Sequence, residues 1–264
     1  EMTTDELYVL EDKIQHGIDV ATLGFVTVKD NQAFVTNNSK LAPFTTEPSL
    51  QRAHDKVNDG GSVFTSAISI PEVTSVSKSL SVEANPNGRI ELNGLKMLGA
   101  NKELTLTDSL LISDSLDLNA GIVNLGAGSI ILSASAENLG GSSSSFVRTN
   151  GAGQFVHRTQ AVTEKNYPVG IGSSYLPLSL SNSGTSDDLG VRVADGVLEG
   201  AVQVDTVVGA TWTVNEAVTG GSVLQTTFNW PGSKERAGFD RASVFVDRLS
   251  GANWTNLSGA TPLV

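Results

Sequence analysis

The strongest hydrophobic pattern in the chain is a unit of about six residues that repeats between Leu104 and Ser135. Each unit opens with two apolar residues that flank one other residue, and it closes with small or polar residues; the units are 104–109, 110–115, 116–121, a longer one at 122–129, and 130–135. Such a triplet forms a short strand whose first and third side chains share a face. Ser, Thr, Asn, Asp and Gly favour the corner that follows. Strands this short at near-constant spacing predict a β-solenoid, in which each coil pairs with the next.

The solenoid pattern predicts which side chains point inward. The first and third positions of the triplets should form a stacked core: Leu104, Leu106, Leu110, Ile112, Leu116, Leu118, Leu125, Ile130 and Leu132. The middle positions should point outward: Thr105, Leu111, Asp117, Val123 and Ile131. They form no ladder of threonines, so an ice-binding solenoid is not expected. Leu111 and Ile131 are expected to pack beneath the N-terminal segment or, alternatively, to mark an assembling face.

The segment before the repeats mixes β-type patterns with one helix. Two alternating runs in 24–36 flank Asp30-Asn31 and predict a hairpin. A short helix should begin after Thr46 or Ser49, carry Leu50, Ala53 and Val57 on one side, and end at Gly60-Gly61. Because it is mostly polar, it is expected to be a surface connector.

After Ser145 the apolar runs lengthen. They fall at 175–180, 190–193, 210–214, 224–230 and 243–246, and turn-forming pairs separate them. Longer strands of this kind predict an antiparallel β-sandwich. Trp212, Trp230 and Phe239 are expected to be buried in its core, and Trp254 belongs to the same region.

The predicted fold is therefore all-β: a short β-solenoid followed by an antiparallel β-sandwich. The expected domains are an N-terminal β-rich segment with one short helix (1–70), the solenoid (71–160) and the sandwich (161–264). The alternative is a single sandwich built from short strands.

Charge and composition exclude several functions. Lys and Arg total 17 against 28 Asp and Glu, so the net charge is −11. This balance argues against nucleic-acid binding, which needs basic patches, and against docking on an anionic membrane. The chain has no Cys, which excludes disulfides and thiolate metal sites. No apolar run is long enough for a membrane-spanning helix.

The search for catalytic residues finds no convincing set. His16, His54 and His157 are isolated and are expected to be surface or turn residues. Polysaccharide-cleaving solenoids use clustered carboxylates, for which the candidates are Asp108, Asp114 and Asp117, but Asp also suits solenoid corners. Asp187-Asp188 could bind Ca²⁺ weakly, although a solvated loop is the simpler interpretation. We therefore predict no catalytic residue, no cofactor and no metal site.

The C-terminal half resembles a module of secreted proteins of Bacteroidota, the substrates of the type IX secretion route. The residues that carry the resemblance are 145–153 (SFVRTNGAG), 166–170 (NYPVG), 175–177 (YLP), 212–216 (WTVNE), 220–222 (GGS), 228–230 (FNW) and 239–242 (FDRA). The resemblance implies an extracellular or cell-surface protein with a structural or adhesive role and no enzymatic activity. Its implied partners are further copies of the chain or other surface proteins, with glycans also considered. The alternative is a carbohydrate-active β-helix that binds or cleaves polysaccharide.

The resemblance also implies sites of modification. Exported proteins of this group carry O-linked glycans on the hydroxyl of an Asp–Ser/Thr–aliphatic tripeptide. Three positions of the chain match it, namely Ser109, Ser115 and Thr206. A glycan is bulky and hydrated, so each acceptor should lie at the surface.

Overall fold

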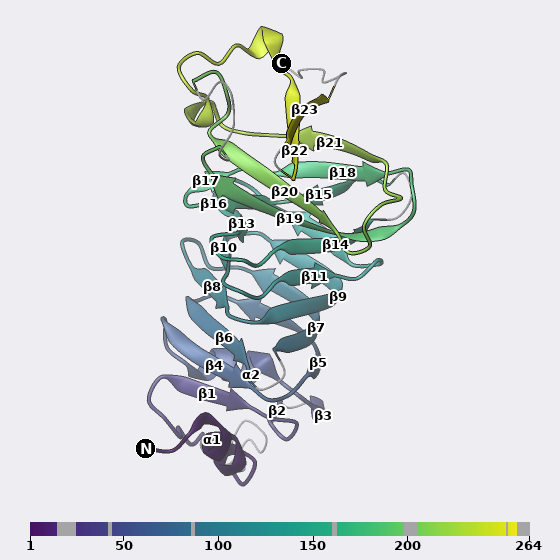
Figure 1. Cartoon of the computed structure of the whole chain (residues 1–264). Helices are drawn as coiled ribbons and strands as arrows, with labels where there is room; N and C mark the ends of the chain where they lie inside the picture. Colours follow the sequence, from purple (N-terminus) through teal and green to yellow (C-terminus); the bar gives the residue numbers. More distant parts are fainter. Residues whose placement is uncertain are drawn as a thin grey trace.

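The computed structural model describes residues 1–14, 25–41, 44–85, 88–159, 163–197, 205–251 and 253–257. About 51% of the chain is strand and 9% is helix, and the strands form a β-solenoid of about five coils followed by antiparallel sheets. The predicted fold class is therefore confirmed. Figure 1 shows the coils stacked into a column, with the N-terminus at one end and the antiparallel sheets at the other.

Two sheets form the walls of the solenoid. The first sheet is parallel throughout except for its last, antiparallel strand; it contains β1 (Gln32–Val35), β4 (Gly61–Thr65), β6 (Leu80–Ala84), β8 (Glu103–Leu106), β10 (Gly121–Leu125), β13 (Ser145–Arg148), β16 (Val169–Ile171) and β17 (Ser174–Tyr175). The second sheet contains the parallel strands β5 (Ser69–Val76), β7 (Arg89–Met97), β9 (Ser109–Leu118), β11 (Ile130–Leu132) and β14 (Phe155–Thr159), then the antiparallel β19 (Asp187–Asp195) and β20 (Ala210–Glu216). The short β12 (Glu137–Gly140) pairs with the second half of β9.

The six-residue units are successive sides of one coil. The units that begin at Leu104, Leu110 and Leu116 form β8 and the two halves of β9. A register irregularity near Asn93, between β7 and β9, separates these halves, so that the coil turns there. In the next coil, Val123 lies beside Leu104 and Ile130 beside Leu110.

The predicted core is confirmed. All nine residues expected to point inward are at most 2% exposed. Their side chains stack from coil to coil, which removes a continuous apolar surface from water. Val123 was wrongly placed outside: it is fully buried, and Asn124 occupies the outward position beside Thr105 instead. In the longer unit, 122–129, the inward triplet starts at the second residue and not at the first. A shift of one residue along a strand exchanges its inward and outward faces.

The N-terminal segment differs from the prediction in its pairing. The expected hairpin is wrong, because β1 pairs in parallel with β4 of the solenoid and Phe25 to Val28 form no strand. A turn does occur at Asn31, which has a positive φ of 49°. A small antiparallel pair, β2 (Lys40–Leu41) and β3 (Phe44–Pro48), follows.

Within the described ranges there are two α-helices where one was expected. The predicted helix is α2 (Leu50–Lys56), with Ser49 as its N-cap. It is not a surface connector, because Leu50 and Ala53 belong to the main core. The helix missed by the sequence interpretation is α1 (Thr4–Glu11), which begins with a capping box between Thr3 and Glu6.

The C-terminal region adds antiparallel layers to the solenoid. A three-stranded sheet contains β15 (Lys165–Tyr167), β18 (Leu178–Asn182) and β21 (Leu224–Phe228), and a separate hairpin contains β22 (Val246–Ser250) and β23 (Asn253–Leu257). Two 3-10 turns, η1 (Gly232–Lys234) and η2 (Arg241–Ser243), lie between them. The solenoid sheets continue into this region, since β14 pairs with β19 and Val147 lies beside Val169.

Candidate functional site

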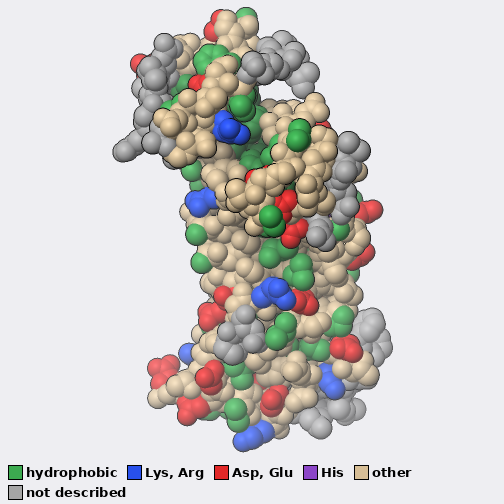
Figure 2. Space-filling model, turned by 45° about the vertical axis from the view of Figure 1, so that its right-hand side comes forward, with side chains coloured by type: hydrophobic (Ala, Val, Ile, Leu, Met, Phe, Trp, Pro, Cys, Tyr) green, Lys and Arg blue, Asp and Glu red, His purple; other side chains and the backbone are tan. Residues whose placement is uncertain are grey.

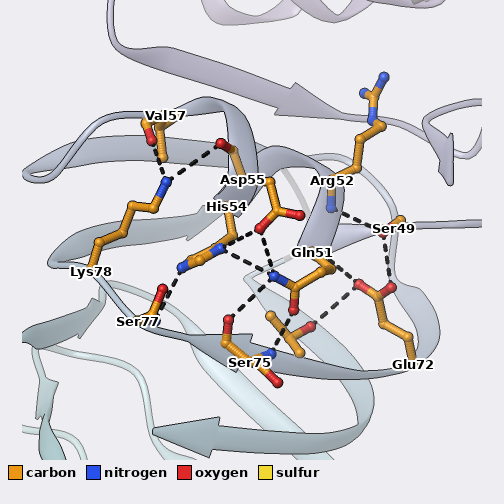
Figure 3. Close-up of polar contacts among 11 residues, drawn as sticks. Ser49, Gln51, Arg52, His54, Asp55, Val57, Glu72, Ser75, Ser77 and Lys78 are labelled. Atoms are coloured by element: carbon orange, nitrogen blue, oxygen red, sulfur yellow. Dashed lines mark hydrogen bonds and ion pairs between the residues drawn. The ribbon is translucent and has the colours of Figure 1, made fainter. Parts of the chain in front are cut away.

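The edge of the second sheet at the N-terminal end is covered by helix α2 (Figure 3). The Gln51 side chain accepts a hydrogen bond from the Ser75 backbone N–H at 2.7 Å and donates one to the Ser75 carbonyl at 3.3 Å. Nε2 of His54 accepts from the Ser77 backbone N–H at 3.2 Å. These side chains therefore supply bonds that a neighbouring strand would make to the edge of β5, and they shield that edge from other chains.

Polar contacts also fix both ends of α2. Ser49 accepts a hydrogen bond from the Arg52 backbone N–H, and its hydroxyl donates to Glu72 of β5 at 2.9 Å. Glu72 also accepts from the Gln51 backbone N–H at 2.8 Å, where the positive end of the helix favours an anion. At the other end, the Lys78 ammonium donates to the Val57 carbonyl at 2.7 Å. These contacts stabilise α2 on the sheet.

A buried ion pair joins the two helices. A guanidinium nitrogen of Arg52 lies 2.5 Å from a carboxylate oxygen of Glu11, and the two side chains are 1% and 4% exposed. Arg52 also donates to the Phe34 carbonyl at 3.3 Å, and the Ser39 hydroxyl donates to Glu11. Removing one partner of such a pair leaves a charge in the protein interior, so this contact ties α1 to the solenoid.

The described histidines were wrongly predicted to lie at the surface. His54 is 3% exposed, and both of its ring nitrogens take part in structural hydrogen bonds. His157 is 2% exposed, points inward between Leu132 and Leu189, and has no hydrogen-bond partner on either ring nitrogen. Burial, and to a lesser degree the charge of Lys165, lowers the pKa of His157 to about 4. His16 lies outside the described residues.

The three candidate carboxylates of the solenoid lie in separate local surroundings. Asp108 accepts hydrogen bonds from the Ala84 backbone N–H at 2.8 Å and from Thr107, as expected of a corner residue. Asp117 accepts from Asn119 and lies beside Lys96 of the neighbouring coil. Asp114 is exposed at the bend within β9. Nothing in these contacts pairs two carboxylates across a cleft, as polysaccharide cleavage requires.

Asp187 closes a turn between two strands. Its carboxylate accepts hydrogen bonds from the backbone N–H groups of Asp188 (2.8 Å) and Val218 (3.0 Å), and the residue is 8% exposed. A carboxylate that is satisfied by N–H donors is poorly placed to bind Ca²⁺, which needs several oxygen ligands. Across the described residues, no group of three or more Asp, Glu, His or Cys side chains is arranged to hold a metal ion.

The three candidate acceptors for O-glycans differ in their surroundings. Ser109 is half-buried at the start of β9, and its hydroxyl accepts a hydrogen bond from the Ser129 backbone N–H at 3.1 Å. Ser115 is half-buried near the bend in β9, beside Gly94 of the previous coil. Thr206 is exposed in the turn before β20. Thr206 therefore meets the condition of exposure best.

The tryptophans predicted to be buried are only half-buried. Trp212, Trp230 and Phe239 form a chain of ring contacts, with centroids 6.4 Å and 6.0 Å apart. The indole N–H groups are anchored, Trp212 to the Leu176 carbonyl and Trp230 to the Glu235 carboxylate. The hydrogen bond from Arg241 lowers the pKa of Glu235, and the bond from Trp230 adds to this effect. Trp212 and Trp230 are packed against the edge of the main core.

An apolar column follows the outer face of the second sheet. Leu111, Ile131 and Val156 lie side by side in consecutive coils and are half-buried. Helices α1 and α2 pack on β1, β4 and β5 instead. Figure 2 shows hydrophobic side chains along the middle of the solenoid, whereas acidic side chains gather around its N-terminal end.

Helices α1 and α2, the only two α-helices within the described ranges, are too short to cross a membrane. Searches against protein-family models, curated proteins and solved structures found no match to the chain.

Proposed function

We propose that the protein is a non-enzymatic, extracellular protein of the cell surface, with a structural or adhesive role in a larger or multimeric assembly. The observation that carries this proposal is the column of buried residues, which continues from coil to coil between Val35 and Val193. Each coil contacts mainly its neighbours and hydrogen-bonds to them, so the column is a stiff spacer with long exposed faces. The polar side chains described above, such as those of Gln51, His54 and Arg52, hold helices and strands together.

The proposed location rests on the resemblance to type IX secretion substrates. The segments that carry the resemblance contribute to β13, β15, β16, β17 and β20, where the solenoid joins the antiparallel sheets. Such a junction suits a module that displays terminal domains at a distance from the cell. The acidic balance keeps the chain soluble and repels anionic surfaces.

Size and activity measurements test the proposal together. Sedimentation and negative-stain microscopy of the purified protein should show rods that form ordered assemblies, and a panel of polysaccharides with added Ca²⁺ should remain uncleaved. Cleavage that Asp114→Ala or Asp117→Ala abolishes would replace this proposal with the enzymatic one.

The half-buried aromatic rings support a second candidate, glycan binding. Aromatic faces beside a charged pair can stack on and hydrogen-bond to sugars, and Trp230, Phe239, Glu235 and Arg241 supply both elements. Titration with oligosaccharides should then quench tryptophan fluorescence saturably in the unchanged protein and less in Trp230→Ala. A flat titration would leave the rings as scaffold.

Glycosylation of Ser109, Ser115 or Thr206 is proposed on the resemblance alone. Intact-mass spectrometry of the protein from its native source decides it. A mass above that of the bare chain, lost in part in Thr206→Ala, would support modification at the exposed acceptor.

A further inference from the structure

The second sheet ends in a strand whose outer edge has no partner among the described residues. The order of this sheet ends β14–β19–β20, so β20 pairs on one side only (Figure 1). Beside its start, the segment around Glu235 forms one antiparallel bridge to Val208 and then turns away. The edge from Ala210 to Glu216 is therefore left open in the described structure.

The hydrogen bonds at both ends of β20 show which backbone groups face this open edge. The Ala217 N–H donates to the Asp188 carbonyl, and the Gly209 carbonyl accepts from the Gly196 N–H. Bonded pairs alternate along an antiparallel ladder, so Thr213 faces β19 with its backbone groups. The N–H and C=O groups of Trp212 and Val214 consequently point away from β19.

The sequence of β20 does nothing to block this edge. Natural edge strands are protected by Lys, Pro, bulges or a covering element. The seven residues of β20 include no Lys, Arg or Pro, and Glu216 at its end is the only charged residue. The edge of β5 at the opposite end, in contrast, carries Pro71 and is covered by Gln51 and His54.

We propose that two copies of the chain associate through the open edges of β20, antiparallel and around a two-fold axis at Thr213. In this register Trp212 of each copy lies opposite Val214 of the other, so outward-facing N–H and C=O groups meet in pairs. The pairing joins the two second sheets into one. It deepens the proposed function, on which it rests, by naming the surface that starts the assembly.

The charges near the edge are compatible with this register. Glu216 of one copy comes opposite Ala210 of the other, so the two glutamates lie at opposite ends of the interface. Ala210 follows Gly209, beside which the guanidinium of the exposed Arg236 lies, whereas Lys234 is already paired with Asp195. Glu216 of one copy therefore comes near Arg236 of the other. The net charge of −11 on each copy opposes association, but physiological salt screens it.

A single cysteine tests the register directly, because the chain contains none of its own. At the axis the two copies of residue 213 form a non-hydrogen-bonded pair, whose Cα atoms approach to about 4.5 Å, within the span of a disulfide. Thr213→Cys should therefore give a covalent dimer under mild oxidation. Ser113→Cys, at an exposed position of β9 in the middle of the same sheet, is the matched control and should remain monomeric on a non-reducing gel.

Charge reversal tests the same contact without a cross-link. Thr213→Lys and Thr213→Glu each bring two like charges face to face, which should raise the dissociation constant of the dimer by about tenfold or more. Mixing the two variants should restore dimers in sedimentation runs, an outcome that misfolded variants cannot give. Ser113→Lys, on the central strand β9, should leave association unchanged.

The outcomes separate this proposal from the proposed function. If the unchanged protein assembles but Thr213→Cys does not cross-link and Thr213→Lys still assembles, another surface is used and only the β20 contact is overturned. If the unchanged protein stays monomeric at all concentrations, the β20 contact and the assembly role both fail.

Discussion

Both sheets end against a covering element at the N-terminal end of the solenoid, whereas the second sheet ends in an open strand at the other end. The Gln51 amide presents a donor and an acceptor side by side and so replaces a strand at the edge of β5. Burial follows the same division: among the described residues after Val193, only Gly209 and Ala210 are buried. The chain seals one end with side chains and leaves main-chain groups available at the other.

This difference predicts different energetic consequences for similar changes at the two ends. At the covered end, side chains that lose a partner remain inside the protein and pay the full cost of desolvation. At the open end, water replaces the lost partner. Matched substitutions at both ends can therefore test this difference.

The largest effect is expected for the buried ion pair. Arg52→Met leaves the Glu11 carboxylate buried without its cation and should lower the free energy of unfolding by about 3–5 kcal/mol. The double variant Arg52→Met/Glu11→Leu should recover most of this loss. Arg241→Met, which breaks the exposed pair with Glu235, should cost about 0–1 kcal/mol. Urea titrations measure all three, and equal losses at Arg52 and Arg241 would contradict the comparison.

Core packing should give the next largest effect. Leu116 is fully buried, and Leu116→Ala should cost about 2–5 kcal/mol because it leaves a cavity in the stacked column. Val218, at the open end, is 70% exposed, and Val218→Ala should change stability by less than about 0.5 kcal/mol. Thermal and urea unfolding of both variants checks this contrast. A small loss in Leu116→Ala would mean that the column is not closely packed.

His157 should make stability depend on pH where the solenoid meets the antiparallel sheets. Its folded pKa of about 4 lies below the ordinary histidine value of 6.5, so the unfolded chain binds the proton more tightly. Its contribution is therefore fully present above pH 6.5 and is lost as the pH falls towards 4, by about 3 kcal/mol. His157→Leu, which matches the neighbouring Leu132 and Leu189, should remove this dependence. Urea titrations at several pH values measure it, and an unchanged slope in the variant would assign the effect to other groups.

The smallest change is expected at the covered edge. Gln51→Ala leaves the Ser75 N–H and carbonyl without this partner and should cost about 1–3 kcal/mol. It should also create association through β5, because the freed edge can pair with another strand. Gln225→Ala, at an exposed position of β21, is the control for both stability and sedimentation. If Gln51→Ala stays as stable and as dispersed as the control, the edge is protected by other contacts.

Several features of the fold could be predicted from the sequence. The apolar first and third positions of the triplets between Leu104 and Leu132 identified the inward side chains, since burial of alternate residues is a local property of a strand. Ser49 identified the start of α2. The capping box of Thr3 and Glu6 could have identified α1 in the same way, because both helix signals lie within a few residues.

Other features depended on contacts between distant segments. The strand around Phe34 was expected, but the sequence could not say whether it pairs with its neighbour in sequence or with β4. The expected alternation was wrong, because both faces of β1 are buried: Ala33 and Val35 join the main core, whereas Phe34 packs with residues of α1. The burial of Arg52 and His54 could not be predicted either. Their polar groups are tolerated inside only because Glu11 and Ser77, from other parts of the chain, meet them.

The class of fold and the inward positions of the solenoid could thus be predicted from the amino-acid pattern, whereas the way in which each sheet ends follows from contacts between distant segments. Hydrophobic periodicity indicates which side of a strand is buried, and it can be read from a few neighbouring residues. The partner of a backbone N–H or carbonyl at a sheet edge cannot be predicted in this way, since it is whichever segment lies alongside in the folded chain. For this reason the covered edge at Ser75 and the open edge at Trp212 and Val214 became visible only in the folded chain.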